Sequence, residues 1–323
     1  MPRCPSRMED YRLPDLPRYV RINTLLTSRS AVEKRLKESG HFYCPDPKHP
    51  GNRSYFRSPD VPDLLVFKPK GQSDISRIPM IASGEVVVQQ LASCFPALAL
   101  APPPGAWAID GCAAPGNKTS HLAALMRNKG RVFAFEINER RCNLLQDMMK
   151  TKGVSIVLTK HASFLDASPT DPEYSKVSHV LLDPSCSSSG MSRTPETDPE
   201  RLRELAQNQL TLVLHAMRFP AVEAVVYSTC SMLQTRHATL LHATSLSPCS
   251  SELPLRNVKC CAHLTQAFMR LRMRMLCARS SSSKMTSLSM WLCHGGIGVA
   301  MRFVMEIQLM SSSLDPLCDA HTL

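Results

Sequence analysis

No run of eighteen or more apolar residues occurs in this 323-residue chain, which argues against a membrane span. A charged N-terminal region followed by an apolar stretch is also missing, so the sequence gives no sign of secretion. In a chain of this length without such a signal, the 13 cysteines are expected to be reduced thiols rather than a disulfide framework. The remaining composition, 43% hydrophobic and 20% charged, is that of an ordinary folded protein.

Two common kinds of ligand site are missing as well. Neither G-x-G-x-x-G nor a P-loop occurs, so the sequence does not support phosphate binding. A metal site is not expected, because His41, Cys44 and His49 are interrupted by prolines and have no fourth ligand.

The net charge of +11 is unevenly distributed. Residues 1–80 carry 15 Lys and Arg against 9 Asp and Glu, residues 81–231 carry 14 against 14, and residues 232–323 carry 9 against 4. A neutral middle region therefore has basic flanks on both sides. Basic flanks are typical of polyanion binding, although a solvated basic surface would give the same count.

These three regions also differ in pattern. Residues 1–80 predict a small α+β module, with a strand at 18–24, a helix at 31–39 and a second strand at 63–67. Residues 81–231 alternate between strand and helix, which predicts a Rossmann-like α/β fold with a parallel sheet. The strands of this core are expected at 107–110, 132–136, 156–158, 180–182 and 224–227, and its helices at 119–129, at 138–152 and after Asp198-Pro199.

A turn of small residues, DGCAAPGNKT at 110–119, follows the first of these core strands. In open α/β sheets, ligands bind beyond the carboxyl ends of the strands, and small residues let the backbone approach them closely. Glu136 ends the next strand, where a carboxylate commonly accepts hydrogen bonds from a ribose. A nucleoside cofactor without phosphates fits this pattern, and S-adenosylmethionine is the obvious candidate.

Two cysteines follow the last two core strands. Cys186 lies in DPSCSSSG at 183–190, and Cys230 lies in STCS at 228–231. A single cysteine in such a place is usually a small buried hydrophobe, but two at paired strand ends suggest chemistry. Methylation of cytosine at C5 needs a thiolate that adds to C6 and a second group that helps to remove the C5 proton. Asp183 could hydrogen-bond to the base and polarise it.

The turn at 110–119, the loop at 183–190 and the triplet at 229–231 together resemble the signature motifs of the Sun-domain (RsmB-type) RNA cytosine-C5 methyltransferases. The resemblance covers about residues 16–231 and is nearest to the eukaryotic branch that acts on large-subunit ribosomal RNA. It implies a class I S-adenosylmethionine-dependent methyltransferase sheet, an RNA substrate bound partly by the basic N-terminal module, and a nuclear, nucleolar location. It also implies that Cys230 attacks C6, that Cys186 assists product release and that Asp183 serves the site. The cofactor-binding residues implied are Cys112, Ala113, Ala114, Pro115, Gly116, Asn117, Lys118, Glu136, Ser163 and Asp183.

The sequence departs from the family pattern in three places. Ser163 stands where an Asp or Asn usually contacts the adenine, with Asp166 as a possible substitute. Ser188 replaces a common glycine and is expected to restrict the Cys186 loop. After residue 231 the usual acidic run is replaced by MLQTRH, and the tail at 232–323 has 13 Ser, 6 Cys and 9 Met. This composition favours a shifted reading frame or an alternative exon, whereas the alternating apolar residues at 299–309 argue against it.

Three other functions remain open from the sequence. A chain without a complete sheet would be a catalytically inactive RNA-binding or ribosome-assembly protein. A DNA cytosine methyltransferase would carry its nucleophile in a Pro-Cys motif, but Ser185 precedes Cys186 here. A small-molecule methyltransferase would not need two cysteines at the sheet edge.

Overall fold

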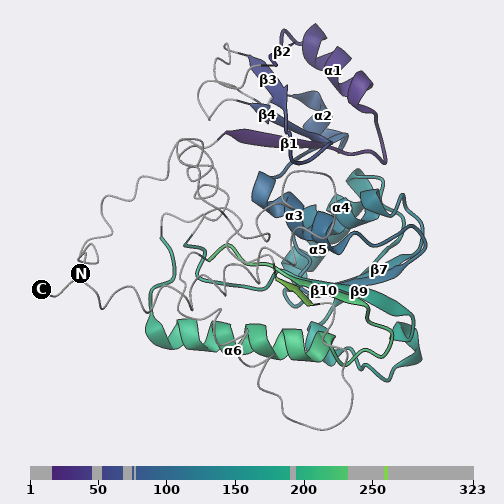
Figure 1. Cartoon of the computed structure of the whole chain (residues 1–323), viewed down its shortest axis with the longest axis vertical. Coiled ribbons are helices and arrows are strands. Elements are labelled where there is room, and N and C mark those ends of the chain that lie inside the picture. The colour runs from purple at the N-terminus through teal and green to yellow at the C-terminus, as the bar shows by residue number, and fades with distance from the viewer. Residues whose placement is uncertain are drawn as a thin grey trace, which may run out of the picture.

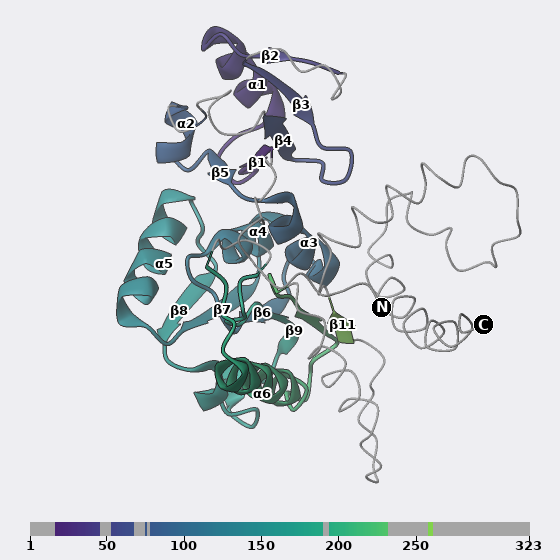
Figure 2. The same cartoon turned by 90° about the vertical axis from the view of Figure 1, so that its left-hand side faces the viewer.

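The computed structural model describes residues 17–45, 53–67, 75, 78–189, 194–231 and 258–260. These residues form a five-stranded sheet at the N-terminal end and a six-stranded sheet that follows it. The smaller sheet and its helices lie at the top of the molecule, above the larger sheet and its helices (Figure 1). Figure 2 shows the same two parts of the molecule from the side.

The small sheet is the N-terminal module, and its central strand is β1. This strand pairs antiparallel with both β4 and β5, and the full strand order is β2-β3-β4-β1-β5. Apolar side chains from its strands and helices form a separate buried cluster that includes Val20, Leu36 and Phe67. The elements of the module are β1 (Arg18–Ile22), α1 (Arg29–Glu38), β2 (Phe42–Tyr43), β3 (Ser54–Arg57), β4 (Leu64–Phe67), α2 (Pro79–Ala82) and β5 (Val86–Val88).

The sequence placed the end of this module at residue 80, but the small sheet continues beyond it. Strand β5 (Val86–Val88) pairs with β1 through Val20, Arg21 and Ile22, so residues up to 88 belong to the N-terminal sheet. The short apolar run at 86–88 carries no signal of which sheet it joins. Its place is decided by pairing with a strand more than sixty residues earlier.

The larger sheet is entirely parallel, with the order β11-β10-β9-β6-β7-β8. The predicted α/β fold class is therefore confirmed, and each predicted core strand is present with ends that differ by a few residues. The six strands are β6 (Trp107–Asp110), β7 (Arg131–Glu136), β8 (Val157–His161), β9 (Val177–Leu182), β10 (Ala224–Tyr227) and β11 (Val258–Cys260).

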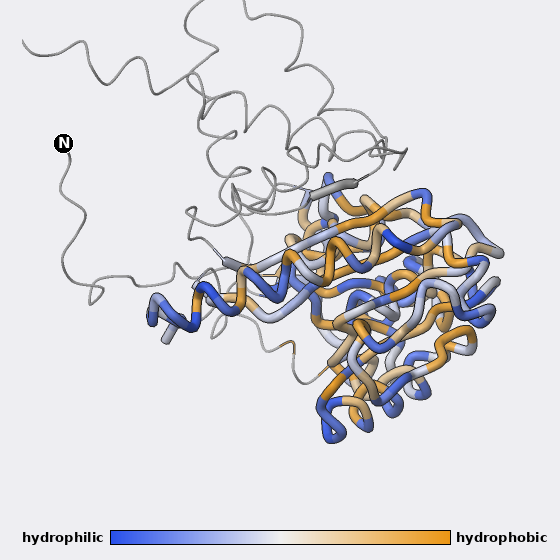
Figure 3. The backbone as a smooth tube through the Cα atoms, turned by 90° about the horizontal axis from the view of Figure 1, so that it is seen from below, coloured by the Kyte–Doolittle hydropathy of each residue, from blue (hydrophilic) through white to orange (hydrophobic). Residues whose placement is uncertain are grey.

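Helices cover both faces of this sheet. On one side, α3 (Leu91–Leu100) and α4 (Asn117–Leu125) pack together, and α5 (Glu139–Thr151) contacts β7 and β8. On the opposite side, α6 (Pro199–Ala216) contacts β9 and β10. Successive strand residues point to opposite faces, so Val225 and Tyr227 meet the α6 side while Val226 meets α3. Figure 3 colours the described backbone by hydropathy, with orange hydrophobic stretches in its interior and blue hydrophilic residues on many outer turns.

The helix starts follow capping rules that are readable in the sequence. The Asp198 side chain accepts hydrogen bonds from the Glu200 and Arg201 backbone N–H groups, and Pro199 occupies the first turn of α6. Asn138 caps α5 in the same way, through the Arg141 N–H. Helix α3 is not predicted by the sequence pattern, because it contains Pro96 in its interior.

Most of the atypical tail lies outside the described residues, including the alternating segment at 299–309. Its described part, β11, extends the parallel sheet beyond β10. No helix in the described part of the chain is long and apolar enough to cross a membrane.

Candidate active site

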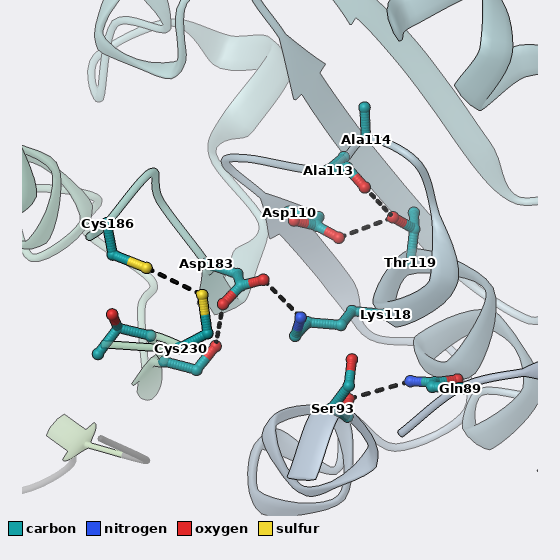
Figure 4. Close-up of polar contacts among 12 residues, drawn as sticks. Gln89, Ser93, Asp110, Ala113, Ala114, Lys118, Thr119, Asp183, Cys186 and Cys230 are labelled. Atoms are coloured by element: carbon teal, nitrogen blue, oxygen red, sulfur yellow. Dashed lines mark hydrogen bonds and ion pairs between the residues drawn. The ribbon is translucent and has the colours of Figure 1, made fainter. Parts of the chain in front are cut away.

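The carboxyl ends of the parallel strands bring the predicted site residues to a common edge of the sheet. The turn at 110–119 follows β6, Glu136 ends β7, Asp183 and Cys186 follow β9, and Cys230 follows β10. Neighbouring parallel strands present their carboxyl ends side by side, so residues far apart in the sequence meet there. Figure 4 shows the β6 turn, Asp183 and both cysteines in one close-up.

The turn after β6 is held in a fixed shape by hydrogen bonds. Ala113 N–H donates to the Phe135 carbonyl oxygen at 2.9 Å, and Gly116 N–H donates to the Ala113 carbonyl oxygen at 2.8 Å. Gly116 has a φ of 101°, in the region that favours glycine. A Cβ on Gly116 would lie 2.6 Å from Met149 and 2.8 Å from Leu145, both on α5. Glycine is therefore needed at position 116 both for the turn conformation and for close packing against α5.

Asp110 is the first residue of this turn and lies outside the set of site residues that the sequence predicts. It is buried, and its Oδ2 accepts a hydrogen bond of 2.8 Å from the Thr119 hydroxyl. Its Oδ1 is buried and makes no hydrogen bond within the described part of the chain. Burial raises the pKa of Asp110 to about 6, against the opposing effect of the Thr119 hydroxyl. A buried acceptor without a partner is typical of a place where a ligand donates.

Asp183 connects the β6 turn to the loop after β10. The Lys118 ammonium group forms an ion pair with Asp183 Oδ2, and the Ser228 hydroxyl donates to Asp183 Oδ1 at 2.8 Å. Lys118 and Asp183 are largely covered, with 18% and 29% of their side chains exposed. Both carboxylate oxygens are thus oriented by a donor from a different loop, which fixes Asp183 beside the cysteines.

Cys186 and Cys230 form a hydrogen-bonded pair, with 3.0 Å between their sulfur atoms. The hydrogen bond from Cys230 lowers the pKa of Cys186 to about 5, assisted by the Thr229 hydroxyl and the Ser188 backbone N–H. The same hydrogen bond, together with burial, raises the pKa of Cys230. The two thiols therefore share one hydrogen bond, and their pKa values are displaced in opposite directions.

The loops that carry these cysteines are tied to each other and to the core. The hydroxyl oxygens of Ser187 and Ser231 lie 2.7 Å apart, and Gln209 on α6 donates to the Ser185 carbonyl oxygen at 2.7 Å. Ser188 has a φ of 55°, the left-handed conformation that glycine adopts without strain. The predicted restriction at Ser188 thus corresponds to a backbone conformation that is costly for serine.

Glu136 is buried and accepts a hydrogen bond of 2.9 Å from the Asn138 N–H. The Arg141 guanidinium lies 3.4 Å from its other oxygen and donates to the Ala114 carbonyl oxygen at 2.8 Å. Arg141 thereby joins the end of β7 to the β6 turn. The sequence does not predict Arg141, whose only signal is its place in the first turn of the helix after Glu136.

Ser163 lies beyond the end of β8, at the start of the short 3-10 helix η3 (Phe164–Asp166). Its hydroxyl accepts a hydrogen bond of 3.2 Å from the Leu165 N–H, and its own N–H donates to Asp166 Oδ2 at 3.1 Å. The two residues form a capping box. One oxygen of the predicted substitute, Asp166, is therefore used in holding the backbone of Ser163.

The fold and the arrangement of its edge define a class I methyltransferase, the Rossmann-like class that uses S-adenosylmethionine. A solved methyltransferase homologue from Pyrococcus horikoshii agrees, with a TM-score of 0.58 and 28% identity, over 71% of this chain and 70% of the archaeal one. A second structure, NSun6 from the same organism with SFG, has a TM-score of 0.59 at 20% identity and supports the fold alone.

Within that class, the chain belongs to the RsmB/F Sun-domain family of RNA methyltransferases. Residues 97–246 match the family described as 16S rRNA methyltransferase RsmB/F. Residues 16–89 match the ferredoxin-like domain of NOL1/NOP2/Sun domain family member 5. The resemblance seen in the sequence motifs is thus confirmed.

Two similar proteins indicate the branch of the family. The chain is 41% identical over 232 residues to the mouse 28S rRNA (cytosine-C(5))-methyltransferase, covering 68% of this chain and 50% of the mouse protein. It is 38% identical over 251 residues to the Arabidopsis thaliana 25S rRNA (cytosine-C(5))-methyltransferase NSUN5, covering 73% of this chain and 41% of the plant protein. The chain thus spans about half the length of these relatives, or less.

Proposed function

We propose that this protein methylates C5 of a cytosine in large-subunit ribosomal RNA, using S-adenosylmethionine and a covalent bond between Cys230 and C6 of the base. The observation that carries the proposal is the Cys186–Cys230 pair, 3.0 Å apart, beside the fixed carboxylate of Asp183. Family membership and the two rRNA methyltransferase relatives support the substrate class. The site of action would then be the nucleus, at the nucleolus, where ribosomal RNA is made.

The residues of the β6 turn fit S-adenosylmethionine. The small side chains of Ala113 and Ala114 and the positive φ of Gly116 keep this turn compact, and the buried Asp110 Oδ1 is an acceptor without a hydrogen-bond partner in the described part of the chain. The predicted set from Cys112 to Lys118, with Glu136 and Asp183, would hold the cofactor. When bound, it supplies the methyl group that C5 of cytosine receives.

The chain's own residues would perform the remaining steps. The Cys230 thiol releases its proton to solvent, and the resulting thiolate adds to C6 of the cytosine. The electrons of the C5–C6 double bond move to C5, which forms its new bond to the methyl group. A base then removes the C5 proton, and the electron pair returns through C6 to break the bond to Cys230. Asp183 would polarise the ring, and Cys186 stands where it can help the release.

The base must leave its stack to reach this edge. RNA methyltransferases that act on a base take it into a pocket and hold it there. The basic N-terminal module would bind the flanking phosphates. The carboxyl-end edge of the larger sheet would then be free to carry out the methylation.

The test uses ribosomal RNA that contains 5-fluorocytosine, which cannot lose a proton from C5. Incubation of the full chain with this RNA and S-adenosylmethionine should give a covalent adduct on a denaturing gel. The adduct should disappear in Cys230→Ala and persist in Cys186→Ala. Cys44→Ala, in the N-terminal module, is the control and should form as much adduct as the wild type.

The absence of an adduct from folded wild-type chain would overturn the proposal and favour a non-catalytic RNA-binding or assembly role. An adduct that is lost in Cys186→Ala and kept in Cys230→Ala would overturn the assignment of the nucleophile.

A further inference from the structure

Arg21 is a buried charge that crosses from the N-terminal module to the methyltransferase core. It lies on β1, and only 1% of it is exposed. Its Nε donates to the Gln89 side chain at 2.7 Å, and its Nη2 donates to the Ser120 hydroxyl at 3.0 Å. The same Nη2 lies 3.5 Å from the Asn117 carbonyl oxygen. Ser120 and Asn117 belong to the first turn of α4, which continues from the turn at 110–119, here called the cofactor turn.

The partners of Arg21 are neutral oxygens. Within the described residues Arg21 forms no ion pair with a carboxylate, although burial is nearly complete. Burial lowers the pKa of Arg21 to about 10, so the guanidinium stays charged at neutral pH. The charge of Asp63 favours the guanidinium but forms no ion pair with it among the described residues, and an apolar side chain of similar size would pack here without the cost of burying a charge. A packing role alone therefore does not account for an arginine at this position.

Asn117 is held from two further directions. Lys152, at the end of α5, donates to Asn117 Oδ1 at 2.9 Å, and Asn117 Nδ2 donates to the Val88 carbonyl oxygen at 3.4 Å. Val88 belongs to β5, so a second strand of the N-terminal module contacts the cofactor turn. Asn23 in turn donates to the Lys152 carbonyl oxygen at 2.9 Å. Figure 4 shows the neighbouring Gln89, whose amide continues to the Ser93 carbonyl oxygen.

We infer that Arg21 is a positioning residue for the cofactor turn and that the N-terminal module thereby completes the cofactor site. The inference rests on the proposed function, because it takes the turn at 110–119 to bind the cofactor. The reason is geometric: Arg21 contacts Asn117, directly before Lys118, and Ser120, two residues after it, and Lys118 orients Asp183. Releasing Arg21 loosens the first turn of α4 and the loop that leads into it.

The experiment compares Arg21→Met, which keeps the bulk but removes the charge and donors, with Arg29→Met in the same module. Arg29 pairs with the exposed carboxylate of Asp63 and donates to the Pro62 carbonyl oxygen, both within the N-terminal module. Calorimetry should show that Arg21→Met weakens S-adenosylmethionine binding by about tenfold or more, while Arg29→Met binds as the wild type does. The KM for S-adenosylmethionine should rise by a similar factor, with kcat at saturating cofactor within about twofold.

A second, milder variant keeps the test valid where Arg21→Met fails to fold. Ser120→Ala removes one acceptor of Arg21 and should also weaken cofactor binding, by less than Arg21→Met. In the double variant the two effects should not add, because both remove the same contact.

Normal cofactor affinity in folded Ser120→Ala and Arg21→Met would overturn this inference alone. A fall in kcat without a change in cofactor affinity would also overturn it. A wild-type chain that binds no S-adenosylmethionine would overturn the proposed function, and this inference with it.

Discussion

The sulfur atoms of Cys186 and Cys230 lie 3.0 Å apart, although 44 residues separate them in the sequence. They follow β9 and β10, which are parallel neighbours in the sheet. Each residue alone is an ordinary half-buried cysteine; together they share a hydrogen bond and titrate as a pair. This relationship leads directly to the first prediction.

Alkylation of Cys186 by iodoacetamide should follow a pH profile with its midpoint near 5, because the Cys230 hydrogen bond lowers the pKa of Cys186 to about 5. A lowered pKa keeps the reactive thiolate present down to lower pH. In Cys230→Ala the donor is gone, and the midpoint should move up toward the ordinary thiol value of 9. Mass spectrometry of the Cys186 peptide from pH 4.5 to 9 gives the profile. A wild-type midpoint above 8 would contradict the effect of the Cys230 hydrogen bond on the pKa of Cys186.

Replacement of Lys118 by Met should lower the free energy of unfolding by about 1–3 kcal/mol, because it leaves the largely covered Asp183 without its charged partner. Lys150→Met is the matched control. Lys150 pairs with Asp147 at 3.6 Å, but both side chains are more than 70% exposed, so its loss should cost under about 0.5 kcal/mol. Urea unfolding measures both. Equal losses in the two variants would show that the burial of the Lys118 pair has no energetic consequence.

Gly116→Ala should destabilise the protein more than Gly105→Ala. The two glycines have similar φ values, 101° and 97°, so backbone strain of about 1–2 kcal/mol is common to both. A Cβ at Gly105 meets no atom within 4 Å, whereas one at Gly116 overlaps Met149 and Leu145. Overpacking should add about 1–3 kcal/mol at Gly116. Thermal unfolding compares the variants, and matching losses would locate the whole cost in the backbone.

Asp110→Asn should become more stable relative to the wild type as pH rises. The pKa of Asp110 is raised to about 6, so its stabilising contribution is complete below the ordinary value of 3.8 and is lost as pH rises through 6. Asparagine carries no charge and escapes this loss. The difference in unfolding free energy should grow by about 1–3 kcal/mol between pH 4.5 and 7.5. A constant difference over that range would mean that Asp110 does not titrate there.

Much of the methyltransferase core is predictable from local pattern. Ala224–Tyr227 is a continuous apolar run between turn signals, and Asp198-Pro199 is a helix start, so both were found without tertiary information. Because parallel strands share an edge, finding the strands also placed the cysteines. Their meeting at one edge followed from topology, whereas the 3.0 Å distance did not.

The parts that were missed depend on contacts between distant residues. Helix α3 holds a proline and is apolar on most sides, since it packs against α4 and the sheet, and so it shows no helical period. Arg141 lies outside every motif, and its contact with Ala114 has no signal in the sequence. Asp110 begins the motif at 110–119, but nothing in the sequence shows that one of its oxygens is buried and unpaired. The boundary at residue 80 failed to include β5 for the same reason.

The link from Arg21 to Ser120 also bears on how the chain is made. These residues are 99 positions apart, so β1 leaves the ribosome well before α4 exists to receive the guanidinium. Domains generally fold in order of synthesis. The N-terminal sheet can therefore form its own apolar cluster early, but the Arg21 guanidinium must stay hydrated until α4 emerges. Docking of the N-terminal module on the methyltransferase core is then a late event of biogenesis. On a ribosome that stalls before residue 120, the central strand of the module would still carry the exposed charge of Arg21.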